Sequence, residues 1–224
     1  MSAPGAPVDE GGKAAEAVDP DFEPVTHRGL VFRSCMVPLH LLCRTVFPLR
    51  AFGLEHVAPS GGMLIACNHQ SFLDIPFVAV AVSPRHVAFM ARRSLEEHAA
   101  IRFLIRTCGA IPVDRGRADR AALRRAAAHL RAGDLVAVYP EGTRTRDGRI
   151  APFKRGAVLA ARMASVPILP CAIRGSFEAW PRTRRLPRPQ RIEVRFGPPV
   201  DAAADDALER VEARVREMYE SAAG

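Results

Sequence analysis

The sequence predicts a single α/β domain with a mostly parallel, mixed sheet flanked by helices, preceded by an amphipathic helical segment. The first observation is that short apolar runs alternate along the chain with stretches in which apolar residues recur at helical spacing. The second is that these runs are almost entirely apolar, as expected for strands buried on both faces of a parallel sheet. The third is size, because 224 residues, 48% of them hydrophobic, suffice for one such domain.

The beginning of the chain differs in composition from the rest. Residues 1–27 are acidic and contain repeated proline, glycine and alanine, with few side chains to bury. They lack the basic start and the apolar stretch of a signal peptide. We therefore interpret this segment as a disordered leader.

Residues 28–52, RGLVFRSCMVPLHLLCRTVFPLRAF, form the first strongly apolar segment. Arginines and prolines interrupt it, and its longest uncharged run is too short to cross ~30 Å of hydrocarbon as a helix. Two interpretations remain open. The segment is either an amphipathic helix that associates with a membrane, with its arginines at head-group depth, or an ordinary helix packed on the domain. The domain itself is expected to span residues 53–224.

Within the domain, each expected element is an apolar run or a helical pattern bounded by polar or turn residues. The expected strands are 63–67, 86–90, 109–113, 134–139, 167–173 and 191–196. The expected helices are 75–82, 94–107, 117–132, 154–165 and 204–221. Gly133 directly follows one of these helices and is a typical C-terminal cap. The stretch 181–191, PRTRRLPRPQR, is predicted to be a loop that either contacts phosphate groups of lipid or RNA or is a solvated connection.

Charge and composition limit the classes of function. The net charge of +8 favours polyanionic partners such as nucleic acid, anionic lipid or phosphorylated substrates. Aromatic residues make up only 6% of the chain, which leaves few rings for stacking on bases. The five cysteines are scattered without a C-x-x-C pair, which argues against a disulfide framework or a structural zinc site. The sequence also lacks the G-x-S-x-G, H-E-x-x-H and phosphate-loop motifs.

The polar block NHQSFLD directly follows the expected strand 63–67. Its histidine, His69, and its aspartate, Asp74, have a spacing that does not place them on one face of a continuous helix. The spacing instead suits a histidine on the loop leaving a strand and an aspartate in the first turn of the next helix. Asp74 would then accept one ring N–H and stabilise the imidazolium formed when His69 takes up a proton. Taken alone, the block favours a simpler interpretation, a helix cap beside an ordinary loop histidine.

Three further blocks carry groups that bind anions. GAIPVDR delivers its arginine to the carboxyl edge of the sheet, where open α/β sheets place ligands. YPEGTRTRDG, residues 139–148, follows a buried strand and reads as a site loop whose glycine permits close approach of a ligand. FKRG opens a helix and places its lysine near the helix N-terminus. The candidate anion-binding residues are Arg115, Glu141, Gly142, Thr143, Arg144 and Lys154.

A last block, VPILP at residues 166–170, reads as core packing or as the wall of a site. With it the chain resembles the glycerolipid acyltransferase family over about residues 50–200, because NHQSFLD, GAIPVDR, YPEGTR and VPILP occur in that family's order and at its separations. Within the family, the likeness is greatest to 1-acyl-glycerol-3-phosphate (lysophosphatidate) acyltransferases. The agreement of four independent motifs outweighs the helix-cap interpretation of the first block.

The resemblance implies that His69 and Asp74 form the catalytic pair. It implies a phosphate site for the acceptor at Arg115, Glu141, Gly142, Arg144 and Lys154. It also associates the VPILP block with the side of the acyl donor. Tyr139, at the start of YPEGTR, stands where the family usually has phenylalanine.

The implied reaction is transfer of an acyl chain from a thioester, acyl-CoA or acyl-ACP, to the free hydroxyl of a lysophospholipid, with His69 as general base. The preferred acceptor is 1-acyl-glycerol-3-phosphate, which would give phosphatidic acid. No metal and no bound cofactor are expected. The expected partners are membrane lipids and the acyl donor, and nucleic acid is not expected as a partner. The expected location is the cytoplasmic face of the inner membrane. The alternatives are another lysolipid acceptor, such as a lyso-ornithine lipid, and a non-catalytic basic protein that binds lipid or nucleic acid.

Overall fold

The computed structural model describes residues 30–92, 110–113 and 119–221. Three predictions fall outside this part of the chain, namely the leader 1–27, the helix 94–107 and Arg115. Among the described residues, seven strands form one sheet in the order β1-β7-β6-β2-β5-β3-β4. Neighbouring strands are parallel except for β6 and β7, which confirms the predicted mostly parallel, mixed sheet. The strands are β1 (Leu49–Phe52), β2 (Met63–Cys67), β3 (Val87–Arg92), β4 (Ala110–Val113), β5 (Leu135–Val138), β6 (Ile168–Arg174) and β7 (Ile192–Phe196).

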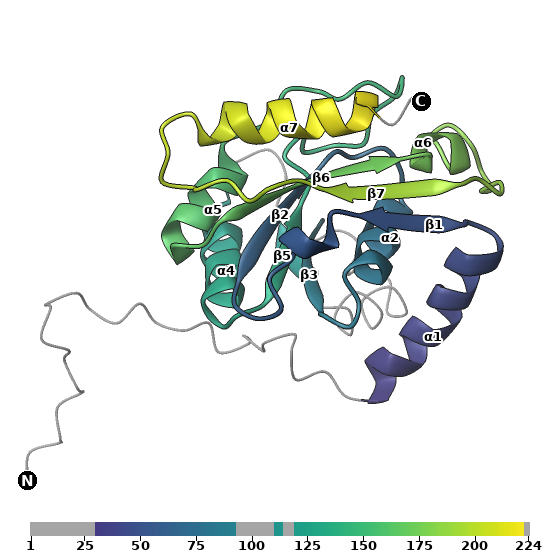
Figure 1. Ribbon diagram of the computed structural model, residues 1–224, viewed down its shortest axis with the longest axis horizontal. Helices are drawn as coiled ribbons and strands as arrows, with labels where there is room; N and C mark the ends of the chain where they lie inside the picture. Colours follow the sequence, from purple (N-terminus) through teal and green to yellow (C-terminus); the bar gives the residue numbers. More distant parts are fainter. Residues whose placement is uncertain (1–29, 93–109, 114–118, 222–224) are drawn as a thin grey trace, which may run out of the picture.

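Helices cover both faces of this sheet (Figure 1). In the described ranges they are α1 (Leu30–Thr45), α2 (Asp74–Ala81), α4 (Arg120–Arg131), α5 (Gly156–Ala164), α6 (Ser176–Ala179) and α7 (Ala207–Ser221), with a short 3-10 turn, η2 (Leu54–His56). The first core lies between one face of the sheet and α4, α5 and α7, and the second lies between the other face and α1 and α2. The α/β layering that the sequence predicts is therefore confirmed.

The central strand β2 shows why these strands read as unbroken apolar runs. Leu64 and Ala66 lie in the core under α4, α5 and α7, whereas Met63, Ile65 and Cys67 lie in the core under α1 and α2. All five side chains are buried. Because successive residues of a strand point to opposite faces, a strand covered on both sides needs an apolar side chain at every position. Beyond the end of β2 that requirement ends, and polar residues follow.

The prediction that residues 28–52 form one helical segment is wrong at its end. Leu49–Phe52 form β1, which pairs in parallel with β7 at the edge of the sheet. The side chains of this strand alternate between half-buried and exposed positions. A four-residue edge strand buries little apolar surface, so its pattern is not distinguishable in the sequence from the end of an amphipathic helix. The folded domain accordingly begins before residue 53.

Helix α1 has two different faces. On one face Cys43 and Phe47, just beyond the helix, are buried against the domain, and the ring of Phe47 meets that of Phe77 edge to face at 5.6 Å. On the other face the apolar side chains Val37 and Leu41 are 70% and 62% exposed. The helix therefore packs on α2, as the second interpretation expects, and it also presents an exposed apolar stripe on its other side. In the described part of the chain, no helix is both long and apolar enough to cross a membrane.

Candidate active site

The first and third polar blocks emerge side by side at the carboxyl edge of the sheet. β2 and β5 are parallel neighbours, and their registers align Ala66 with Val138. NHQSFLD leaves the end of β2, and YPEGTR leaves the end of β5. Strands that are distant along the chain therefore deliver both blocks to the position where open α/β sheets bind ligands.

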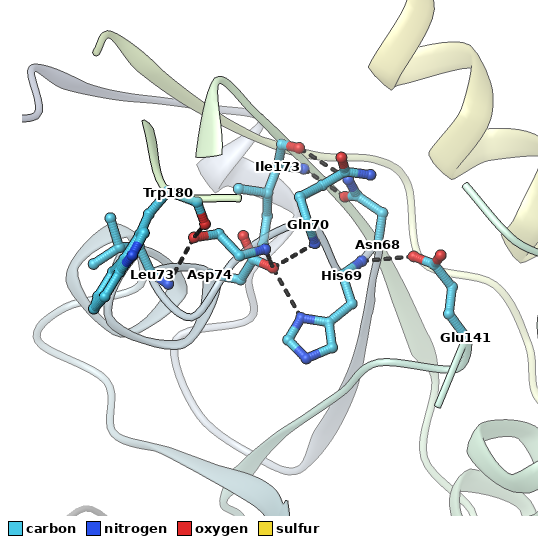
Figure 2. Close-up of polar contacts among 9 residues, drawn as sticks. Asn68, His69, Gln70, Leu73, Asp74, Glu141, Ile173 and Trp180 are labelled. Atoms are coloured by element: carbon cyan, nitrogen blue, oxygen red, sulfur yellow. Dashed lines mark hydrogen bonds and ion pairs between the residues drawn. The ribbon is translucent and has the colours of Figure 1, made fainter. Parts of the chain in front are cut away.

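The predicted histidine–aspartate pair is formed. The ring nitrogen Nδ1 of His69 and the oxygen Oδ2 of Asp74 are 2.9 Å apart (Figure 2). The same oxygen accepts the backbone N–H groups of Gln70 at 2.7 Å and Ser71 at 2.8 Å. Asp74 is fully buried and is the first residue of α2, where the helix dipole favours a negative charge. One carboxylate thus folds the loop and fixes the imidazole. The helix-cap interpretation is wrong, because the N-cap of α2 is Leu73 and it has no side-chain cap hydrogen bond.

The second nitrogen of His69 is the one available for chemistry. An ionised carboxylate only accepts hydrogen bonds, so Nδ1 must carry the hydrogen that it shares with Asp74, and Nε2 is left as the basic atom. Figure 2 shows the far side of the ring pointing away from Asp74. The side chain of His69 is 13% exposed, which leaves this edge within reach of a ligand. The ring of Tyr139 stacks on the imidazole with centroids 4.1 Å apart and planes inclined by 23°, and this contact holds its orientation.

Glu141 has a different position from the one expected of a phosphate-binding residue. Its Oε1 accepts the backbone N–H of His69 at 2.6 Å, and its Oε2 accepts that of Ala151 at 2.9 Å (Figure 2). The residue is only 3% exposed, and burial raises the pKa of its carboxyl, although the two N–H groups oppose that shift. A carboxylate with both oxygens on backbone donors repels a phosphate rather than binding it. The contacts therefore point to Glu141 as a positioning residue for the loop that carries His69.

Two further residues of the first block anchor this loop, although the sequence pattern predicted no role for them. The side chain of Asn68 donates to the carbonyl of Ile173 at 2.9 Å and accepts the N–H of the same residue at 2.7 Å (Figure 2). The hydroxyl of Ser71 donates to the carbonyl of Trp180 at 2.8 Å. Asn68 and Ser71 are fully buried. The sequence signal for this role was the polar run directly after an apolar strand. Polar side chains that are buried there require hydrogen-bond partners.

Arg144, in the third block, lies next to the first block, and Lys154 lies next to the third. The guanidinium carbon of Arg144 is 3.3 Å from the ring centroid of Phe72, a residue of NHQSFLD that is 52% exposed. Lys154 donates its backbone N–H to Pro140 at 3.0 Å, and its ammonium lies so close to Gly142 that a Cβ there would be 2.7 Å from it. Gly142 has a φ of +75°, which favours glycine.

The remaining predicted residues are Thr143, Arg115 and those of the VPILP block. Thr143 is exposed beside Arg144. Arg115 lies outside the described residues. The VPILP block enters β6 from the amino edge of the sheet, and Ile168 and Leu169 are fully buried within it, which matches the core-packing interpretation.

The chemistry of the site does not require a cysteine. Cys67 is fully buried at the end of β2, and burial raises the pKa of its thiol well above the ordinary value, an effect to which Cys171 and Asp74 add. The reactive form of cysteine is the thiolate, so Cys67 is a poor nucleophile. Among the described residues, no group of three or more histidine, cysteine, aspartate or glutamate side chains is arranged to hold a metal ion.

A second histidine–aspartate pair has the same spacing as the first. His129 Nδ1 and Asp134 Oδ2 are 2.8 Å apart, and both residues are buried. This pair joins the end of α4 to the start of β5, at the amino edge of the sheet. The length of a strand separates it from His69, so it is a structural contact and not a part of the site.

Replacing His129 with alanine should lower the free energy of unfolding by about 1–3 kcal/mol, because the buried hydrogen bond to Asp134 is lost. Catalytic turnover per folded molecule should stay the same. Urea unfolding and a turnover assay on the folded fraction would measure both. A normal free energy of unfolding combined with lost turnover would contradict this assignment.

Comparison with known proteins agrees with the geometry. A family model described as Acyltransferase matches residues 49–174. The 1-acyl-sn-glycerol-3-phosphate acyltransferase of Bacillus subtilis (strain 168) is 28% identical over 145 residues, which are 65% of this chain and 72% of that protein. The 1-acyl-sn-glycerol-3-phosphate acyltransferase alpha of Ovis aries is 34% identical over 151 residues, which are 66% of this chain but only 52% of the sheep protein.

A solved structure is similar over most of the chain. The 1-acyl-sn-glycerophosphate (LPA) acyltransferase of Thermotoga maritima matches with a TM-score of 0.72 and 26% identity, covering 85% of this chain and 80% of that one. The family model spans more than half of the chain and includes both His69 and Asp74. The chain therefore belongs to the acyltransferase family.

Proposed function

We propose that this acyltransferase moves an acyl chain from a thioester to the free hydroxyl of 1-acyl-glycerol-3-phosphate, giving phosphatidic acid. The observation that carries the proposal is the joining of the two polar blocks at His69. Its N–H donates to Glu141 Oε1 at 2.6 Å, and its carbonyl accepts the N–H of Thr145 at 2.9 Å. His69 and the loop of residues 139–148, which carries Arg144 and is called the cationic loop below, are thus held as one unit. A reaction on a phosphate-bearing acceptor requires such an arrangement.

His69 acts as the general base in this reaction. Nε2 takes the proton of the acceptor hydroxyl while the oxygen attacks the thioester carbonyl carbon, so that a C–O bond forms. The tetrahedral intermediate then collapses, the C–S bond breaks, and the leaving sulfur takes the proton back from the imidazolium. Asp74 stabilises the imidazolium between these steps through the 2.9 Å contact at Nδ1. The thioester is already activated, so the scheme needs no enzyme nucleophile and no metal or bound cofactor.

Arg144 and Lys154 bind the phosphate of the acceptor. Arg144 lies over Phe72, three residues beyond His69, and Lys154 lies beside the turn at Gly142. Guanidinium and ammonium groups provide charge-assisted hydrogen bonds to phosphate oxygens. A phosphate held there keeps the nearby hydroxyl within reach of Nε2. We expect Arg115 to join this site.

The enzyme works at the cytoplasmic face of the inner membrane, where its lipid acceptor and product reside. The exposed apolar stripe of α1, with Val37 and Leu41, supports this location because such a stripe can lie in the head-group region of a bilayer. Acyl-CoA or acyl-ACP is the co-substrate that delivers the acyl chain.

A panel of lysolipids tests the proposed function. The purified full chain would be given one acyl-CoA, and in parallel the matching acyl-ACP, and thiol release would be followed with each acceptor. Selective turnover of 1-acyl-glycerol-3-phosphate is expected. Selective turnover of a phosphate-free acceptor such as a lyso-ornithine lipid would replace the proposed acceptor. Silence with every acceptor and both donors would contradict the proposal as a whole.

Replacing Tyr139 with leucine should lower kcat by up to ~10²-fold, because the imidazole loses the ring stacked on it at 4.1 Å. Replacing it with phenylalanine is the matched control, since the ring is kept and the buried Tyr139 hydroxyl makes no hydrogen bond within the described residues. The phenylalanine variant should therefore retain its turnover. Measurement of kcat for both variants would decide, and equal losses in the two would show that the stack is not the important contact.

A further inference from the structure

The arginine-rich loop of residues 181–191 is a prominent feature to which the proposed reaction assigns no task. It connects α6 to β7 and contains no acidic residue. Its arginines are all exposed, and they are Arg182, Arg184, Arg185, Arg188 and Arg191. Among them stands Leu186, which is 75% exposed. Like charges at this density repel one another, so their concentration here does not serve the stability of the fold. The composition fits a surface that meets a partner both anionic and apolar.

The loop begins directly beside the catalytic loop. Trp180, the residue before it, accepts the hydroxyl of Ser71 on its carbonyl at 2.8 Å. The ring of Trp180 also lies against that of Phe72, with centroids 5.6 Å apart. Ser71 and Phe72 belong to the same polar block as His69. A partner bound by these arginines therefore lies next to the polar block that carries His69.

The loop ends directly beside the segment that leaves α1. Ile192, the first residue of β7, donates its N–H to the carbonyl of Pro48 at 3.1 Å and stands in register with Leu49 of β1. Figure 1 shows the connection from α6 to β7 and the connection from α1 to β1 at the same end of the sheet. The exposed stripe of Val37 and Leu41 on α1 and the basic loop thus lie on neighbouring parts of the molecule, and the catalytic loop lies at the same edge.

Contacts at its base hold the loop in shape. Arg188 donates its backbone N–H to Ala179 at 2.9 Å and its Nε to the carbonyl of Glu178 at 2.7 Å. The indole N–H of Trp180 donates to the carbonyl of Arg184 at 3.0 Å. Because these contacts fix the backbone of the loop, its exposed side chains have defined positions on the surface.

We propose that residues 181–191 form a membrane-docking surface that binds the phosphates of anionic phospholipids, with Leu186 entering the head-group region. The loop then acts together with the apolar stripe of α1 and turns the edge that carries His69 towards the bilayer. This orientation rests on the proposed function, because only a lipid acceptor gives it a purpose. Arginine is suited to the contact, since its planar fork pairs with phosphate oxygens. An acidic carrier protein would match the charge of the loop, but it would not explain the exposed leucine or the proximity of the apolar stripe on α1.

Vesicle binding by the full chain tests this proposal without any need for turnover. The probes are vesicles of phosphatidylcholine alone and vesicles of phosphatidylcholine and phosphatidylglycerol in equal parts, with bound protein measured by co-sedimentation. The test variant is R182Q/R184Q/R185Q. The control is R124Q/R210Q/R214Q, which removes three exposed arginines from α4 and α7, the helices on the sheet face opposite α1 and α2. The two variants have the same net charge.

The wild-type protein should bind the anionic vesicles more tightly than the neutral ones, and added salt should weaken that difference. Each arginine at an anionic surface contributes about fivefold, so the loop variant should lose on the order of a hundredfold in partitioning to anionic vesicles. The control variant should lose only a few-fold. Equal losses in both variants would overturn the proposal, because net charge alone would then account for binding. Unchanged binding of the loop variant would also overturn it.

An activity arm separates this proposal from the rival partner and from the proposed function. With 1-acyl-glycerol-3-phosphate dispersed in detergent and acyl-CoA as donor, the loop variant should turn over like the wild type. A loss confined to reactions supplied with acyl-ACP, with vesicle binding intact, would assign the loop to the carrier protein and refute the membrane surface. A wild-type protein that binds anionic vesicles but transfers no acyl chain would refute the proposed function and leave the docking surface standing.

Discussion

Replacing His69 with alanine should lower kcat for acyl transfer by ~10²–10⁴-fold, because the proposed mechanism then lacks the base that takes the proton of the acceptor hydroxyl. KM for the acceptor should change little, since the proposed phosphate-binding side chains, Arg144 and Lys154, are unchanged. The fold should survive, because the side chain of His69 is partly exposed and its backbone hydrogen bonds to Glu141 and Thr145 are independent of the imidazole. Steady-state thiol release with one acyl-CoA would give both constants.

The second histidine–aspartate pair offers a matched control for that experiment. His129→Ala makes the same chemical change in a pair of the same spacing and a similar distance, 2.8 Å against 2.9 Å. We expect this variant to be less stable but to turn over normally when folded. Near-normal turnover by a folded His69→Ala variant would end the general-base mechanism. Equal loss of turnover in both variants would mean that the assay reports folding rather than chemistry.

Replacing Asp74 with asparagine should lower kcat by ~10³–10⁴-fold, as the same change does behind the catalytic histidine of serine proteases. The amide keeps the size of the side chain but removes the charge that stabilises the imidazolium. Oδ2 of Asp74 alone already accepts the N–H groups of Gln70, Ser71 and the His69 ring, so the amide oxygen can keep these contacts. The NH2 group of the asparagine, however, takes the place of Oδ1, which is buried without a hydrogen-bond partner among the described residues. The kcat should fall without a comparable rise in KM, because Asp74 is fully buried and does not touch the acceptor.

The division between kcat and KM tests this assignment. A raised KM with kcat unchanged would show that Asp74 only shapes the binding loop. The buried NH2 group without an acceptor and the weaker hydrogen bonds to a neutral oxygen should also lower the free energy of unfolding by about 1–3 kcal/mol, which urea unfolding would detect. Turnover must therefore be expressed per folded molecule. Asp134→Asn, the same change in the structural pair, should reproduce the loss of stability without the loss of kcat.

Local patterns along the chain were sufficient to locate most of the elements. The strand expected at residues 63–67 is β2, with the same bounds. The ends of the other predicted strands lie within two residues of their expected positions. Unbroken apolar runs identify strands that are covered on both faces, and this property depends only on neighbours in the sequence. The edge strand Leu49–Phe52 escaped because it is short and half exposed, so it lacks that signature.

Glu141 illustrates a property that local patterns do not contain. In the sequence it is one polar residue of EGTR, and an anion-binding task is as reasonable for it as for its neighbours. In the fold its carboxylate receives the backbone N–H of His69, 72 positions earlier in the chain. That contact exists because β2 and β5 are adjacent and parallel, a pairing that no short stretch of sequence specifies.

The amino-acid sequence was enough to establish the class of fold, the order of its elements and the identity of the His69–Asp74 couple, since these follow from side chains close together along the chain. The spacing of the two residues does not by itself distinguish this couple from His129–Asp134, because both pairs are separated by five positions. Strand pairing over long separations sends one pair to the carboxyl edge, beside the cationic loop, and buries the other at the amino edge. Long-range pairing depends on the packing of the whole sheet, so only the folded arrangement shows which of the two pairs lies beside the cationic loop.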